Sequence, residues 1–480
     1  MTYADIDGME NSSCAGGPFG GMLRWLKAAP AKSWGKVGEV ARQAKKLGQD
    51  DPRRIVHSCK VGSALTLVSL FYYFRPVHEG FGVDAMWAVL TVALVFEYSV
   101  GGTLERGINR MLATVVAGPL AVAVHHISTL WGGEVAEPVL VGVFVFVVAA
   151  IMTFLRFFPV LKARHDYGLM IFILTYCLVS VSGYRDAEVL KMAHTRISTV
   201  AIGFCTSVMI CICICPVWIG VDLHNLVSSN IDKLGDSMQG FGSEYFDIQE
   251  NAYGTLSLSD NKYLLKNYRS VLISKGPEDF MANLARWEPG HGKFKFRHPW
   301  NKYLNVGTLS RQCAYKIEAL NTYLNNEIQA PAAIRNIIRE PSTNICTETG
   351  KALKELAAAL KKMTLSSSAD YHIAHSKAAA ESLMSLLKRG VWKDANVLEI
   401  VPSASVALLL IEVVTCVEKV AEAVHELASA ANFKTDKAQA LQEPVISDES
   451  HVAIAIIHNS KELPDENGSS DDITRTIYNV

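Results

Sequence analysis

The chain has 480 residues, a formal net charge of −1 and 19% charged residues, and this balance favours neither nucleic acid nor an acidic macromolecule as a partner. Its mean hydropathy of +0.18 is high for a water-soluble protein, and the apolar excess lies in the first half. Ten cysteines give no disulfide framework. On a helix, Cys211, Cys213 and Cys215 would point about 200° apart at each step, so they do not converge on a metal.

Residues 1–56 are predicted to form a cytosolic segment without a signal peptide, because no apolar core lies near the start. A basic amphipathic helix is expected within residues 23–47, with its regular part after Pro30. Two interpretations of this helix stand. It lies on an anionic cytoplasmic leaflet, or it is a solvated helix packed on the rest of the protein.

Residues 57–218 are predicted to form a six-helix transmembrane domain. Most of the apolar runs approach the length of about 20 residues that crosses a bilayer. They cover residues 57–74, 83–98, 108–127, 138–155, 167–182 and 197–218. The bias of Lys and Arg toward the loops on the N-terminal side predicts that both termini are cytosolic. Those loops carry Arg106, Arg110, Arg156, Lys162 and Arg164.

The second half predicts a helical cytosolic domain over residues 219–432, because apolar residues recur every three or four positions. Residues 433–480 are polar and acidic, and they are predicted to be a disordered tail. Helices are expected over residues 222–241, 258–275, 280–287, 303–328, 346–363, 369–389 and 406–431. The predicted fold class is an all-α membrane protein with a helical cytosolic domain.

The sequence lacks the signatures of soluble enzymes. It has no Walker loop, no GxSxG, no HExxH and no Cys/His spacing typical of zinc. We therefore predict no catalytic residue, no cofactor and no metal site, and we do not expect an enzyme.

Cations inside or at the ends of the apolar runs are the unusual feature. A Lys or Arg near the middle of a bilayer costs at least about 2.5–3.5 kcal/mol, so several together point to a function. Acidic partners in this zone are few, chiefly Asp84 and Glu97. The excess of positive charge in a medium of low dielectric constant predicts attraction of small anions. The cations are Lys60, Arg106, Arg110, Arg156 and Arg196.

The alternative is that these long side chains only reach the headgroups of the cytoplasmic leaflet. We favour that alternative for Lys162 and Arg164. For Arg110 and Arg196 we favour an anion pathway, since Arg196 is expected on the outer side, where the positive-inside bias does not explain it. Arg106, Trp87 and Glu97 are possible pore or packing residues.

A set of short motifs carries a resemblance to a known family. The motifs are DPRR (51–54), KVG (60–62), AMWAV (85–89), FE (96–97), GINR (107–110), RFFP (156–159), DYG (166–168), CPVWIG (215–220), DLH (222–224) and WEP (287–289). Through them, residues from about 50 to 320 resemble the plant aluminium-activated malate transporter family of anion channels.

The resemblance implies a homodimer of six-span subunits in the lipid bilayer, with one pore between the subunits and a helical cytosolic domain below. It implies conduction of malate, and often of chloride, nitrate or sulfate. Arg110 and Arg196 match the pore arginines of the family, with Lys60 and Arg156 as further basic pore positions. Glu288, beside Trp287, looks like a family glutamate tied to gating. Residues 213–224 overlap a segment proposed to sense GABA.

One departure concerns aluminium. A trivalent cation, like other hard cations, needs several oxygen ligands close together. The outer loops offer Glu79, Asp186 and Glu188, but Ala187 and Lys191 interrupt that acidic patch. We therefore predict that external aluminium does not activate this protein.

The leading hypothesis is a passive channel for malate and small inorganic anions, gated through the cytosolic domain. The short tail favours the plasma membrane over the vacuolar membrane. A coupled, proton-linked carboxylate exporter is the alternative, and a membrane scaffold or sensor is the third reading.

Overall fold

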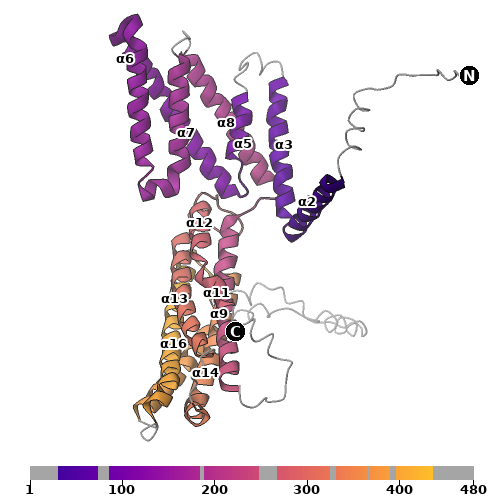
Figure 1. The fold of residues 1–480 in the computed structure, drawn as a ribbon, viewed down its shortest axis with the longest axis vertical. Helices are drawn as coiled ribbons and strands as arrows, with labels where there is room; N and C mark the ends of the chain where they lie inside the picture. Colours follow the sequence, from indigo (N-terminus) through magenta and orange to yellow (C-terminus); the bar gives the residue numbers. More distant parts are fainter. Residues whose placement is uncertain are drawn as a thin grey trace, which may run out of the picture.

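The computed structural model describes residues 31–73, 86–183, 189–247, 267–324, 331–365, 367–389 and 396–435. In these ranges the regular elements are helices, apart from strands β1 (Thr364–Leu365) and β2 (Lys434–Thr435), which pair in parallel. The all-α class is therefore confirmed. Figure 1 shows the helices in two bundles, one above the other, with α2 (Ala31–Asp50) to one side.

The upper bundle exposes apolar side chains, as expected of a surface in lipid. Phe146, Phe154 and Leu70 are 74%, 64% and 59% exposed, whereas the inside holds small residues such as Ala64, Ala117 and Gly107. The bundle consists of α3 (Arg53–Tyr73), α5 (Met86–Val95), α6 (Val100–Leu155), α7 (Pro159–Gly183) and α8 (Val189–Cys213).

Four helical segments are long and apolar enough to cross a membrane. They are Val100–Trp131, Ala136–Leu155, Ala193–Cys213 and Val397–Ala431. The protein is thus an all-α membrane protein. The last of these segments lies in the lower bundle, where its apolar residues pack against other helices.

Helix α6 contains both the third and the fourth expected spans. His125 Nδ1 lies 3.5 Å from Glu137 Oε1, although twelve residues of straight helix would separate them by about 18 Å. The chain therefore folds back between these two residues, which is the turn at the top of α6 in Figure 1. The two arms also pack together, with Ala117 and Ala121 of one arm in the same cluster as Val148 of the other.

Helix ends differ from the expected span ends. Ser99 begins α6, because its Oγ accepts a hydrogen bond from the Gly102 N–H at 3.1 Å. Helix α8 begins at Val189, so Arg196 lies two turns inside the helix rather than at its head. It ends at Cys213, earlier than the Trp218 expected from hydropathy.

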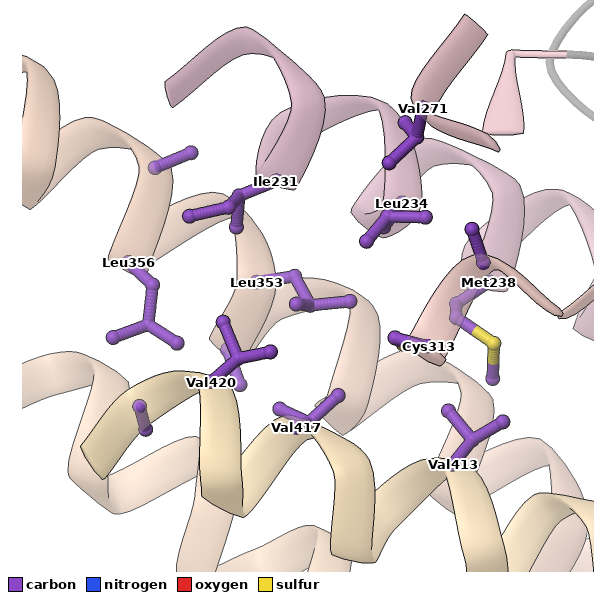
Figure 2. Packing of buried hydrophobic residues seen from close by; sticks show 14 of the residues in the cluster. Ile231, Leu234, Met238, Val271, Cys313, Leu353, Leu356, Val413, Val417 and Val420 are labelled. Atoms are coloured by element: carbon purple, nitrogen blue, oxygen red, sulfur yellow. The ribbon is translucent and has the colours of Figure 1, made fainter. Parts of the chain in front are cut away.

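The lower bundle has a continuous apolar core. Its helices are α9 (Ile219–Asp247), α11 (Tyr268–Leu272), α12 (Lys275–Ala285), α13 (Trp300–Leu324), α14 (Ala332–Lys362), α15 (Ser367–Lys388) and α16 (Val397–Ala431). Figure 2 shows buried residues from α9, α11, α13, α14 and α16 meeting in this core. They include Ile231, Leu234, Met238, Val271, Cys313, Leu353, Leu356, Val413, Val417 and Val420.

Several expectations extend beyond the described residues. Residues 1–30 of the N-terminal segment, the start of the helix expected over residues 258–275, the end of the one expected over residues 303–328 and the tail after residue 435 lie outside them. In α2, Val40 and Leu47 are 64% and 52% exposed, which favours the membrane-surface interpretation of this helix over packing on the described part of the chain.

Candidate functional site

The two arginines favoured as pathway residues share one small pocket in the upper bundle. Arg110 comes from α6 and Arg196 from α8, and Trp87 of α5 lies beside them. The full lining is Trp87, Arg110, Thr114, Ile171, Leu174, Thr175, Leu178, Arg196 and Val200. Two arginines and no carboxylate are among these lining residues.

Glycines bring the three helices close enough to form this pocket. A Cβ on Gly107 would lie 2.0 Å from the Phe204 ring, so α6 and α8 touch one turn from Arg110. A Cβ on Gly203 would lie 2.6 Å from the Ala88 carbonyl oxygen, so α8 and α5 touch as closely. Small residues at helix crossings are the usual means of close packing in membranes.

The arginines of the pocket are buried. Arg110 is 4% exposed, and its Nε and Nη1 have no hydrogen-bond partner among the described residues. Arg196 is 9% exposed, and its guanidinium carbon lies 3.5 Å from the centre of the Trp87 ring. Buried donors without acceptors are costly, so Arg110 is well placed to bind an anion.

The pocket is narrow in this structure. It encloses about 10 Å³, which is the limit for one water molecule. The pocket as it stands in this structure is therefore too small for a molecule larger than water.

Lys60 lies elsewhere, at the end of α8. It is 1% exposed, and its Nζ donates a hydrogen bond to the Cys215 carbonyl at 2.7 Å. Cys215 has φ 39°, in the left-handed region, just after the last turn of α8. A cation there binds a free carbonyl and complements the negative end of the helix dipole.

Replacing Lys60 by Met should separate this capping role from a role in the pore. Removal of the charged donor takes away the hydrogen bond to the Cys215 carbonyl, so we expect a loss of about 1.5–3 kcal/mol of stability. Thermal unfolding of the purified variant should show that loss, while the ratio of malate to chloride permeability stays unchanged. A changed ratio at unchanged stability would contradict the capping role.

Arg156 forms an ion pair at the turn between α6 and α7. Its Nε and Nη2 donate to Asp166 Oδ1 and Oδ2 at 2.7 and 3.1 Å, and both side chains are more than a third exposed. The guanidinium lowers the pKa of the Asp166 carboxyl by hydrogen bonding. Arg156 is not among the residues that line the Arg110 pocket.

Arg106 and Glu97 bind each other. Arg106 Nη1 lies 2.5 Å from Glu97 Oε1, and both side chains are partly exposed. The Arg106 guanidinium also lies 5.8 Å from the centre of the Tyr167 ring. This pair neutralises one of the cations counted in the sequence.

Glu288 joins the two bundles. Its side chain is buried, and Oε1 and Oε2 accept hydrogen bonds from the backbone N–H groups of Ile219 and Gly220 at 2.6 and 3.1 Å. These are the first residues of α9, so the carboxylate caps the helix that leaves the upper bundle. The ring of His291 stacks on Trp218 at 3.9 Å, directly before α9.

Burial raises the pKa of Glu288 to about 7, even though its hydrogen bonds to the backbone oppose the shift. The carboxyl is therefore close to half ionised at neutral pH. Its neighbour in sequence, Trp287, is half-buried and donates its backbone N–H to the Leu284 carbonyl at 3.0 Å.

Close packing completes this junction. A Cβ on Gly101, at the start of α6, would lie 2.4 Å from the Leu284 carbonyl oxygen of α12. A Cβ on Gly220 would lie 2.5 Å from the Trp300 ring. Neither position tolerates a side chain. The contact of Gly101 places α12 of the lower bundle against the base of α6, and the contact of Gly220 packs the start of α9 on α13 within the lower bundle.

Sequence reasoning missed further contacts at the junction. Arg53 Nη1, near the start of α3, lies 3.2 Å from Asp222 Oδ1 on α9, and Tyr98 Oη donates to Asp51 Oδ2 at 3.1 Å. Both carboxylates lie inside motifs quoted above, DPRR and DLH. The acidic residues of those motifs were the available signal.

A buried hydrogen-bond network lies in the lower bundle, close to the start of α9. His224 Nδ1 and His298 Nε2 lie 3.0 and 3.3 Å from the Tyr303 hydroxyl. Desolvation lowers the pKa of His224, and it lowers that of His298 to about 4. Both rings are therefore neutral near pH 7, and they serve as hydrogen-bonding groups of the core.

The side chains proposed above to decide the aluminium response, Glu79, Asp186, Ala187, Glu188 and Lys191, lie outside the described residues. In the part of the chain that the structure describes, no group of three or more His, Cys, Asp or Glu residues is placed to hold a metal ion.

An all-α membrane protein with a buried arginine pocket is the class that fold and site define. The profile of the family described as "Aluminium activated malate transporter" matches residues 45–392. The chain is 50% identical over 402 residues to "Aluminum-activated malate transporter 2" of Arabidopsis thaliana, covering 84% of this chain and 80% of that protein. It is 43% identical over 414 residues to "Aluminum-activated malate transporter 1" of Triticum aestivum, covering 83% and 85%. The chain belongs to the aluminium-activated malate transporter family.

Proposed function

We propose that the protein is a channel for malate and small inorganic anions such as chloride, nitrate and sulfate. The observation that carries this proposal is the pocket lined by Arg110 and Arg196, in which Nε and Nη1 of the buried Arg110 have no hydrogen-bond partner among the described residues. An anion would receive charge-assisted hydrogen bonds there in place of part of its hydration. The relatives are named as malate transporters, which supports transport over an enzymatic function.

The proposed topology has six membrane crossings in each subunit. They are α3, α5, the two arms of α6, α7 and α8. The lower bundle is proposed to lie in the cytosol together with both termini. Helix α16 belongs there despite its apolar composition, because residues such as Val413, Val417 and Val420 are buried in the core of that bundle. We further propose a homodimer in the plasma membrane with a pore at the dimer axis.

Within the pore, we assign the main anion contacts to Arg110 and Arg196. The cation–π contact with Trp87 holds Arg196 in place, and an entering anion would compete with the ring for the guanidinium. Lys60 and Arg156 stay predictions as pore residues, since both bind protein groups in this conformation.

Gating is proposed to pass through Glu288. The carboxylate binds the start of α9, and α9 follows α8, which carries Arg196. A change in the lower bundle that moves α9 would therefore shift α8. We propose that external aluminium is not the trigger, because Ala187 and Lys191 interrupt the acidic patch of the outer loops.

Ion-substitution recordings test the function. Membranes that contain the protein should carry a malate current that reverses at the Nernst potential of malate, and a proton gradient should not shift this reversal potential. The absence of malate current from purified protein in liposomes would refute a channel.

One observation favours a second candidate, a coupled carboxylate exporter. The arginine pocket encloses only about 10 Å³, so it forms no continuous passage in this structure. A coupled exporter has such a closed site, because its binding site opens to one side of the membrane at a time. Coupling to protons would shift the reversal potential with pH, so the same recordings discriminate the two candidates.

A further inference from the structure

We propose that a cluster of cations at the upper rim of the lower bundle binds the anionic headgroups of the cytoplasmic leaflet. This rim cluster consists of Lys293, Lys295 and Arg297, in the loop between α12 and α13, with Lys361 and Lys362 at the end of α14. The inference rests on the proposed topology, which places the lower bundle in the cytosol beneath the membrane.

Contacts between the loop and α14 make these residues one surface. Lys293 Nζ donates a hydrogen bond to the Lys362 carbonyl at 3.3 Å. The Lys361 carbonyl lies 3.3 Å from Nε2 of His224, five residues after the start of α9 at Ile219. Five residues of helix span about 8 Å, so the rim cluster lies close below the upper bundle. All five cations are exposed.

The loop that carries three of them is held rigidly. The backbones of His291 and Phe294 exchange two hydrogen bonds of 2.9 Å, and the His291 ring stacks on Trp218. Phe294 and His298 are buried, while the residues between them are exposed. Arg297 has φ 60°, which turns the chain back into the core.

This arrangement presents an aromatic ring between cations. Phe296 is 68% exposed, and the Arg297 guanidinium lies 5.5 Å from the centre of its ring. Cations with an exposed aromatic side chain are typical of surfaces that contact anionic lipid, because the ring enters the headgroup region and the cations bind phosphate or carboxylate groups.

Acidic side chains of the protein itself do not pair with the rim cluster. Within the described residues, none of its five cations forms an ion pair with an Asp or Glu side chain. Glu426 of α16 is instead paired with Lys302 at 2.7 Å. The Lys361 carbonyl meets α9 about 8 Å along that helix from its start, a length comparable with the Debye length at physiological ionic strength, so we expect the leaflet potential to reach these side chains.

The main competitor for the cluster is the chain's own tail. Residues 436–480 contain nine Asp and Glu residues against three Lys and Arg residues, and they follow β2, which pairs with β1 just after Lys362. The exposed Phe296 and the closeness to the upper bundle favour the membrane. Binding of the tail to the rim cluster is the competing result, and the experiment below distinguishes the two.

Lysine reactivity in nanodiscs measures this contact directly. The full-length protein is placed in discs of phosphatidylcholine, with or without phosphatidylserine, and acetylated with an uncharged reagent. We expect Lys293, Lys295, Lys361 and Lys362 to react at least about threefold more slowly in the anionic discs. The exposed lysines Lys275, Lys388 and Lys419 should react equally in both discs.

Two results would overturn the proposal. One is equal reactivity of the rim lysines in both kinds of disc. The other is slow reactivity in both that becomes fast when residues 436–480 are deleted, which would assign the cluster to the tail.

Matched variants give a second measurement. Replacement of the five rim cations by Gln should lower the amount of phosphatidylserine that the purified protein retains by about threefold. Replacement of five other exposed cations, Arg269, Lys275, Lys388, Arg389 and Lys419, should not. Equal losses in both variants would show a non-specific charge effect and overturn the site. Neither measurement uses malate current, so failure here is distinct from failure of the channel proposal.

Discussion

Replacing Arg110 by Ala should reduce the malate current at least about tenfold. Arg110 is 4% exposed, and two of its nitrogen atoms have no protein acceptor among the described residues. A hydrogen bond to a charged group contributes about 1.5–3 kcal/mol, and each 1.4 kcal/mol is a factor of ten. Voltage-clamp recordings of the expressed protein, normalised to its amount at the cell surface, measure the change.

The conservative variant Arg110→Lys provides the control. Lysine keeps the charge but loses the planar set of donors, so it should retain chloride current better than malate current, since malate offers two carboxylates for paired hydrogen bonds. The Arg196→Ala variant should also lose malate current sharply. If both Ala variants keep wild-type current and selectivity, the pocket is not part of the pore.

Stability of the wild-type protein should decrease as pH rises from about 5 to 7, and Glu288 should be the cause. Burial raises the pKa of this carboxyl from 4.5 to about 7. Between these values the folded protein binds more protons than the unfolded chain, so its free energy of unfolding falls with increasing pH. At 1.36 kcal/mol per pH unit, the loss is on the order of 3 kcal/mol, and it levels off above pH 7.

The Glu288→Gln variant should lack this slope, because its side chain does not titrate. It should also be less stable than the wild type at low pH, since Gln puts an NH2 donor in place of one of the two oxygens that accept from Ile219 and Gly220. Thermal unfolding in detergent from pH 5 to 8.5 measures both effects.

Currents provide a second readout for Glu288. We expect the wild-type current to change with cytosolic pH around a midpoint near 7, and the Gln variant to be insensitive. His291 and Asp222 are the titratable groups nearest to Glu288, so His291→Gln serves as the control and should keep the pH response. An unchanged pH response in Glu288→Gln would exclude this glutamate as the sensor.

The pairing of Arg110 with Arg196 could be predicted only in part from the sequence. Charge in apolar runs and the family motifs singled out both residues. Hydropathy placed them on opposite sides of the membrane, with Arg110 near the start of the third span and Arg196 just before the sixth, because it measures the apolar part of a helix and not its ends. Helix α8 extends to Val189 through a polar flank, since backbone hydrogen bonds do not require apolar side chains.

Other contacts between residues far apart in the chain had no sequence signal. The acceptor for Lys60 is a backbone carbonyl 155 residues away, and a carbonyl is present at every residue. The ion pair of Glu278 with Arg311 in the lower bundle is similar, because only packing brings α12 and α13 together. The ion pair of Arg156 and Asp166 was easier to predict from the sequence, since only ten residues and one turn separate the two side chains.

Helix α9 makes the lower bundle a mechanical lever. Its 29 residues form a rod about 44 Å long, held at the upper end by the Glu288 cap and buried along its length. A tilt of about 5° at Ile219 would displace Asp247 by about 4 Å. In the proposed gating, a push at the far end of α9 would arrive at the base of α8 as a smaller displacement with a larger force. Packed helices resist bending, so the work done at the far end is delivered to the few residues around the fulcrum.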